Sequence, residues 1–252
     1  MIRIFFRKKD IVSITFLAVI CAVIITFLQV GIDAPVNLEG AFLTARDGFI
    51  VLGEREYHSD AFTCTFNMVL AIVFISKLFS EDIDIAKSFV FIRIKKTDIW
   101  FKYKFLQTLV YSFYYSFIYH LSILASVYLL GYKTDKYFVL AKYVIWGMIT
   151  SFMIIFMILV VCNILGLYMK PHLATALITA LTVLSIGVVC FLHLDQVQYH
   201  LLISYFISWH TIASSNSAVY SFPTWSYYAV IAVIILVELI LAKIFVKKKD
   251  FI

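Results

Sequence analysis

Long uncharged runs dominate the hydrophobicity pattern of this chain. Five stretches contain no Asp, Glu, Lys or Arg: 11–32, 105–132, 143–169, 171–194 and 196–237. Each is longer than the about 20 apolar residues that a helix needs to cross a hydrocarbon core about 30 Å thick. Because a soluble domain of this size would not tolerate so many such runs, we predict an all-α polytopic membrane protein.

Six transmembrane helices account best for these runs, and we assign them to one transmembrane domain covering residues 1–252. The expected spans lie at about 11–30, 61–79, 105–130, 139–167, 174–193 and 226–246. An even number of spans places both chain ends on the same side of the membrane.

The charges between the runs predict on which side of the membrane the two chain ends lie. The segments 1–10, 80–104 and 247–249 are rich in Lys and Arg, whereas the loop 31–60 is mostly acidic. Since cytoplasmic segments carry the excess of Lys and Arg, we expect both termini to be cytoplasmic. The short loop 131–138, with two lysines, is a mild exception.

The composition agrees with a membrane protein and indicates which partner the charged residues bind. The chain has 252 residues, of which 63% are hydrophobic and 14% are charged, against about 25% charged in soluble domains. No sizeable soluble domain is therefore expected. The net charge of +6 could point to nucleic acid, but the positive charges lie at the ends of apolar runs. We expect membrane lipid, and no nucleic acid, as the partner of these charges.

Four segments outside the spans have expected structures of their own. Residues 1–10 mix apolar and basic side chains and are predicted to form an interfacial elbow helix. An N-cap pattern at Ser80 predicts a short cytoplasmic helix over about 80–93, and Thr97 with Asp98 resembles the cap of the third span. Residues 194–225 are expected to form short outer or re-entrant helices. The outer loop 31–60 is long enough for a small cap.

Catalytic and metal-binding motifs are missing. The sequence contains no GxxxxGK[ST], GxGxxG, HExxH or GxSxG pattern. We therefore expect no enzymatic activity and no cofactor in this chain, and any energy must come from a partner or an ion gradient. The spacing of His193, His200 and His210 matches no metal site, so we interpret them as members of an interfacial aromatic belt.

A few polar residues lie inside the expected spans. Asn67, Asn163 and Glu238 are candidates for a substrate pathway, because polar residues at membrane depth usually face the bundle interior. The alternative for the two asparagines is interhelical hydrogen bonding. For Glu238 it is a pair with Lys243 or with an asparagine, or a protonated acid. We interpret His120 as a polar residue whose hydrogen bonds are satisfied.

The cytoplasmic segment 80–104 is the most specific signal in the chain. It mixes apolar residues with Lys and Arg and ends with Trp100 and Lys104, where the chain re-enters the membrane. One interpretation is a positive-inside anchor with an interfacial Trp. The other is a helix that docks on a soluble partner.

The layout resembles the integral-membrane permease subunits of ABC transporters, in the type-two exporter class. An elbow matches MIRIFFRKKD, a coupling helix between the second and third spans matches FSEDIDIAKSFVFIRIKKTDIWFKYK, and a basic close matches FVKKKD. The family often has a Gly in the coupling helix, which Ala86-Lys87-Ser88 lacks. The resemblance implies ATPase-coupling roles for Glu81, Asp82, Arg93, Lys96, Trp100 and Lys104.

The resemblance also implies partners and an activity. Two permease chains, the same or related, would pair, and separate ABC ATPase subunits would bind ATP and magnesium below them. The complex would export an amphipathic peptide or lipid-like substrate across the cell membrane. The composition is similar to that of peptide-linked permeases of Gram-positive bacteria, including bacteriocin-immunity permeases.

Two other functions remain open. A sensor or immunity protein would bind a peptide at its outer face through the loop 31–60 and transport nothing. An intramembrane enzyme would need a second carboxylate or a base beside Glu238. Changing Trp100 or Arg93 should impair only an ATP-coupled transporter, and Glu238→Gln should abolish only an acid-dependent enzyme.

Overall fold

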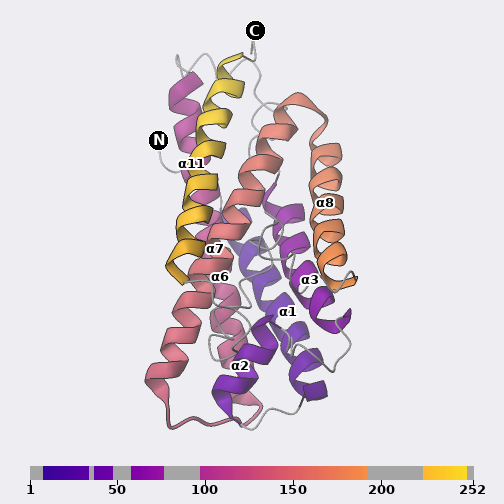
Figure 1. Ribbon diagram of the computed structural model, residues 1–252, viewed down its shortest axis with the longest axis vertical. Coiled ribbons are helices and arrows are strands. Elements are labelled where there is room, and N and C mark those ends of the chain that lie inside the picture. Colours follow the sequence, from indigo (N-terminus) through magenta and orange to yellow (C-terminus); the bar gives the residue numbers. More distant parts are fainter. Residues whose placement is uncertain (1–7, 34–36, 48–57, 77–96, 192–223, 249–252) are drawn as a thin grey trace.

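The computed structural model describes residues 8–33, 37–47, 58–76, 97–191 and 224–248. Within them every regular element is an α-helix (Figure 1). The helices are α1 (Lys8–Asp33), α2 (Leu38–Asp47), α3 (His58–Ile75), α6 (Thr97–Leu129), α7 (Tyr137–Tyr168), α8 (Pro171–Phe191) and α11 (Thr224–Lys248). The all-α prediction is confirmed for this part of the chain.

Each expected span coincides with one of the long helices, and α2 is a short additional helix in the loop between the first two. Two of the helices, over Lys8–Val30 and Tyr137–Tyr168, are long and apolar enough to cross a membrane. Shorter apolar stretches lie at Phe66–Ile75, Pro171–Leu184 and Ala232–Leu241. The count of six spans stays a prediction.

Helix α6 is less hydrophobic than its length would suggest. Its 33 residues correspond to about 50 Å, which exceeds the about 30 Å of a hydrocarbon core. Many of them are Tyr, Ser, Gln or His, and these lower the hydropathy of the helix. The helix therefore combines the length of a membrane span with an unusually polar composition.

Several expected features lie outside the described residues. These are residues 1–7 of the elbow, the cytoplasmic helix at 80–93 and nearly all of the outer segment 194–225. The last residues assigned to the elbow, Lys8 to Asp10, form the first turn of α1. A carboxylate such as Asp10 is favourable there, because the helix dipole is positive at its N-terminus.

Helix α6 lies at the centre of the bundle. It packs against α1 and α7 and also contacts α2, α3 and α11, while α8 packs against α3 and α7 (Figure 1). Helices α6 and α7 form an antiparallel hairpin. After α6 the chain turns at Gly131, whose φ of +91° is in the left-handed region that favours glycine at helix ends.

The ends of the helices alternate as consecutive crossings require. The amide of Leu38 at the start of α2 donates to the carbonyl of Lys133 at 3.1 Å, so the expected outer loops 31–60 and 131–138 meet at one end. At the opposite end, Ser76 after α3 hydrogen bonds Thr175 near the start of α8 at 2.9 Å. The start of α6 and the end of α11 also lie at this second end (Figure 1).

The bundle differs from a soluble protein in the side chains that it exposes. Buried polar residues are numerous, and large apolar side chains are exposed on every long helix. Examples are Phe16 and Phe27 on α1, Phe74 on α3, Phe113 and Phe117 on α6, Ile145 on α7, Leu177 and Leu184 on α8, and Leu236 and Ile240 on α11. A soluble helical protein presents the opposite arrangement, with its polar faces outward.

Candidate functional site: a polar ridge buried on α6

Two rows of polar side chains run along one face of α6. Residues four positions apart lie nearly above one another on a helix, so each row forms a continuous ridge. One row is Lys104, Thr108, Ser112, Ser116 and His120, and the other is Gln107, Tyr111, Tyr115 and Tyr119. All nine are 2% exposed or less, and together we call them the polar ridge.

Tyr115 is the point where the polar ridge connects three helices. Its hydroxyl donates to Oδ1 of Asn67 on α3 at 2.7 Å and lies 3.3 Å from the carbonyl of the same residue. The thiol of Cys21 on α1 lies beside the same hydroxyl. The predicted pathway residue Asn67 therefore belongs to the polar ridge network, in the interhelical role expected of it.

Closer to the start of α6, the polar ridge contacts the first turns of α1. The hydroxyl of Tyr111 donates to Oδ2 of Asp10 at 3.2 Å, and the neighbouring Tyr114 hydrogen bonds Thr15 at 2.8 Å. Nζ of Lys104 donates to Oε1 of Gln107 at 3.1 Å. This end of the polar ridge therefore carries both a carboxylate and an ammonium group.

At its other end the polar ridge meets α7 and α2. The hydroxyl of Ser116 donates to the carbonyl of Met148 on α7 at 2.8 Å. Nδ1 of His120 is 2.8 Å from the carbonyl of Ser116, and the ring of Phe42 on α2 lies 6.4 Å from the His120 ring, centroid to centroid. Beyond His120 the same face of α6 continues with the buried apolar residues Ile123 and Val127.

The polar ridge offers hydroxyl, amide, imidazole and ammonium groups, and its chemistry is that of hydrogen bonding. The described residues hold no group of three His, Cys, Asp or Glu suited to a metal ion. His193, His200 and His210 lie outside those residues. Because buried polar groups in a bundle must satisfy one another, such a ridge holds helices together, and it can line a polar path if they separate.

The other predicted pathway residues lie apart from the polar ridge. Asn163 is buried on α7, and its amide donates to the carbonyl of Leu159 on the same helix at 2.8 Å. Glu238 on α11 has a buried Oε2 without a hydrogen-bond partner among the described residues. Lys243, one of the partners considered for it, is exposed, and no ion pair between the two is present in this part of the chain.

Trp100 and Lys104 are the two predicted coupling residues that the structure describes. Both lie near the start of α6 and are buried, at 0% and 2% exposure. In this conformation neither side chain is presented to a separate subunit, so a coupling role for them would act through the movement of α6. Glu81, Asp82, Arg93 and Lys96 lie outside the described residues.

The sequence predicted that His120 is a polar residue whose hydrogen bonds are satisfied, but it did not lead us to the polar ridge. The signal was present as the repeat of polar residues every four positions from 104 to 120. It is hard to see because Tyr and Ser also occur on the exposed faces of membrane helices.

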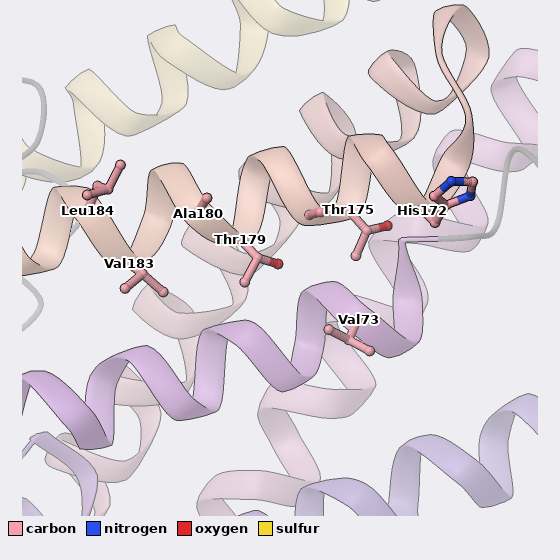
Figure 2. A pocket seen from close by; sticks show the side chains of 8 residues that line it. Val73, His172, Thr175, Thr179, Ala180, Val183 and Leu184 are labelled. Atoms are coloured by element: carbon pink, nitrogen blue, oxygen red, sulfur yellow. The ribbon is translucent and has the colours of Figure 1, made fainter.

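A groove on the outer surface of α8 is a second feature of the bundle. Figure 2 shows its floor, formed by α8 residues that include Thr175, Thr179, Ala180 and Val183, with Val73 of α3 opposite. The groove has a volume of about 730 Å³ and is lined mainly by apolar atoms. Its polar residues are His172, Thr175 and Thr179, and Thr175 hydrogen bonds Ser76.

Comparison with known proteins adds no further constraint on this site. No family model, curated protein or solved structure matches the chain, and its function must be inferred from the bundle and the polar ridge.

Proposed function

We propose that the chain is a multi-pass protein of the cell membrane, with six spanning helices and cytoplasmic termini. One observation carries this proposal: large apolar residues are exposed on all six long helices, while polar residues are buried on α1, α3, α6 and α7. Soluble monomers rarely expose contiguous apolar surface of more than a few hundred Å², whereas lipid covers it without cost. The alternating helix ends and the basic cytoplasmic segments support the same topology.

We further propose that it is the permease subunit of an ABC exporter, as the sequence layout implies. The support is the order of the helices, the length of α6 and its position after the basic segment 80–96. Helix α6 extends about 20 Å beyond a hydrocarbon core, with Trp100 and Lys104 near its start. ATPase subunits that press on the preceding segment would therefore act on a helix that carries the polar ridge through the whole bundle.

In this proposal α6 links ATP hydrolysis to the substrate path. Closure of the ATPase dimer shifts the start of α6, and a rigid helix carries that shift to Tyr115 and His120. The hydrogen bonds from the polar ridge to α1, α3 and α7 then break and reform between two states. Hydroxyl and amide groups freed in one state suit the polar face of an amphipathic peptide or lipid, and a second permease chain would complete the path.

Affinity purification tests the proposal directly. The tagged full chain is purified in mild detergent from its native host, and the proteins that follow it are identified by mass spectrometry. We expect an ATPase with a phosphate-loop motif at about one copy per permease chain. An unrelated tagged multi-pass protein, purified in parallel, controls for carry-over.

The absence of an ATPase, under conditions that preserve a known ABC complex, would contradict the permease proposal. The sensor function would then be preferred, because α2 gives the outer loop 31–60 a defined structure at the outer end of the bundle.

A further inference from the structure

Helix α2 covers the end of the bundle at which the polar ridge stops. Its buried face consists of Leu38, Ala41, Phe42 and Ala45, which pack on α1, α3, α6 and α7. Phe42 lies against His120, the last polar residue of the polar ridge. Beyond His120 the polar ridge is therefore covered by apolar side chains, from Ile123 and Val127 of α6 and from the buried face of α2.

A small set of hydrogen bonds holds α2 to the α6–α7 connection, and we call this set the latch. The amide of Leu38 donates to the carbonyl of Lys133 at 3.1 Å. The hydroxyl of Thr134 donates to Oε1 of Glu39 and accepts the amide of Lys136 at 2.8 Å. Figure 1 shows α2 beside this connection at the end of the bundle opposite the start of α6.

The latch hydrogen bonds are formed, but one acceptor atom of the latch lacks a partner within the described part of the chain. Glu39 is only 8% exposed, and its second carboxylate oxygen, Oε2, is buried without a hydrogen-bond partner among the described residues. A buried oxygen of this kind carries a desolvation cost, which water would remove if α2 lifted. If α2 lifted, the latch hydrogen bonds would break, but water would reach Glu39. The free-energy difference between the closed and the open position of α2 is therefore smaller than the loss of the buried contacts alone would give.

We propose that α2 is an outer gate, which the latch between Glu39 and Thr134 holds over the outer end of the polar ridge. The proposal rests on the proposed membrane topology, in which this end faces outward. When the gate lifts, Phe42 leaves His120, and water and the polar part of a substrate reach Ser116 and His120 from outside. In this proposal the first outer loop, which contains α2, controls the release of substrate at the outer face.

Thiol accessibility in intact cells tests the gate. Ser116→Cys places a nearly isosteric thiol on the polar ridge, and a charged, membrane-impermeant maleimide is added from outside. We expect slow labelling in the closed protein and about tenfold faster labelling when Glu39→Gln and Thr134→Val are added, because a hydrogen bond to a charged group is lost. Labelling of the native cysteines is measured in the same variants without Ser116→Cys and subtracted.

Matched variants separate the latch from general loosening. Thr134→Ser retains the hydroxyl and should label at the parent rate, and so should Asp135→Asn, which removes an exposed carboxylate from the same loop. Phe42→Ala should speed labelling without touching the latch. Ser112→Cys, one turn deeper, should respond in the same direction but label more slowly than Ser116→Cys.

Equal labelling of parent, latch and Phe42→Ala variants, all of them folded and inserted, would overturn the gate. So would an equal acceleration by Asp135→Asn. These outcomes are independent of the ATPase: if no ATPase copurifies but the latch variants label faster, the gate stands and the permease proposal fails. If an ATPase copurifies but labelling does not change, the reverse holds.

Discussion

Single residues of the polar ridge contact more than one neighbouring helix, and Tyr115 is an example. It is fully buried, and its hydroxyl contacts Asn67 of α3 and Cys21 of α1 while its ring stacks on Tyr119 at 6.2 Å between centroids. Removing that hydroxyl leaves the side-chain carbonyl of Asn67 without its donor.

Tyr115→Phe should therefore lower the free energy of unfolding by about 0.5–2 kcal/mol, the range measured for hydrogen bonds between membrane helices and for buried acceptors that lose a donor. The measurement is reversible unfolding in mixed micelles. Tyr128→Phe removes an equivalent hydroxyl from an exposed position on the same helix and should change nothing. Equal effects of the two substitutions would show that Tyr115 does not join the helices.

The two carboxylates with a buried, unpaired oxygen should behave differently. Glu39 accepts a hydrogen bond from Thr134, whereas Oε2 of Glu238 has no partner in the described part of the chain. Glu238→Gln should leave the unfolding free energy unchanged or raise it by about 1 kcal/mol, because Oε2 makes no hydrogen bond among the described residues that the substitution would break and an amide costs less to bury than a carboxylate. Glu39→Gln should lower it. The same micelle assay compares the two variants.

If Glu238 were an essential catalytic acid, Glu238→Gln would instead abolish activity. As a permease, the protein should retain export within about tenfold of the parent. Loss of all activity in a stable, inserted Glu238→Gln protein would favour the enzyme.

At the scale of the element, α6 presents three different surfaces along its length. Its outward face is apolar, its inward face carries the polar ridge, and its first turns bury Trp100 and Lys104. Replacing Trp100 by Ala would remove a large buried side chain, at a cost of about 3–5 kcal/mol. Loss of function in that variant would not distinguish coupling from unfolding, and a gentler pair of substitutions is needed.

Lys102 and Lys104 form that pair. They lie two residues apart on α6, but Lys102 is exposed and Lys104 is buried. Lys104→Met should reduce transport at least about tenfold, since it breaks the contact with Gln107 at the start of the polar ridge. Its stability should change little, because the cost of burying an ammonium group disappears as well. Lys102→Met should transport within about twofold of the parent.

Cargo export from vesicles containing the full transporter is the measurement for this pair. Equal activities of the two variants would remove Lys104 from the coupling route. Equal activities would also mean that no residue supports the proposed movement of α6.

At the scale of the whole molecule, the arrangement of the helix ends makes a prediction about sidedness. Asp135 lies in the α6–α7 connection, beside α2, and Lys170 lies in the α7–α8 turn, where its carbonyl accepts the amides of Leu173 and Ala174. Both residues are exposed. In the proposed topology the first faces outward and the second faces the cytoplasm.

Asp135→Cys should react with an impermeant maleimide in intact cells, and Lys170→Cys only after permeabilisation. The parent chain supplies the background from native cysteines. Reaction of both positions from outside would contradict an odd number of crossings between them, and with it the six-span topology.

Local composition was enough to locate the helices. The hydropathy pattern predicted the positions of all six long helices and Thr97 the start of α6, and the turn that follows α6 contains Gly131 with a positive φ. These features depend only on residues close in sequence: on hydropathy over about 20 positions, on capping and on the conformational freedom of glycine. The amino-acid sequence by itself therefore determined the long helices and their order, but not the short helix α2.

The tertiary structure alone decided which side of each helix is buried. It placed Tyr115 against Asn67, covered His120 with Phe42, buried Trp100 and Lys104, and left Glu238 away from Lys243. In a soluble helix the apolar face marks the core, but here both the outward and the inward faces of the long helices carry apolar side chains. Burial then depends on which neighbouring helix supplies a matching hydrogen bond or surface, and that choice is made by residues far apart in the sequence.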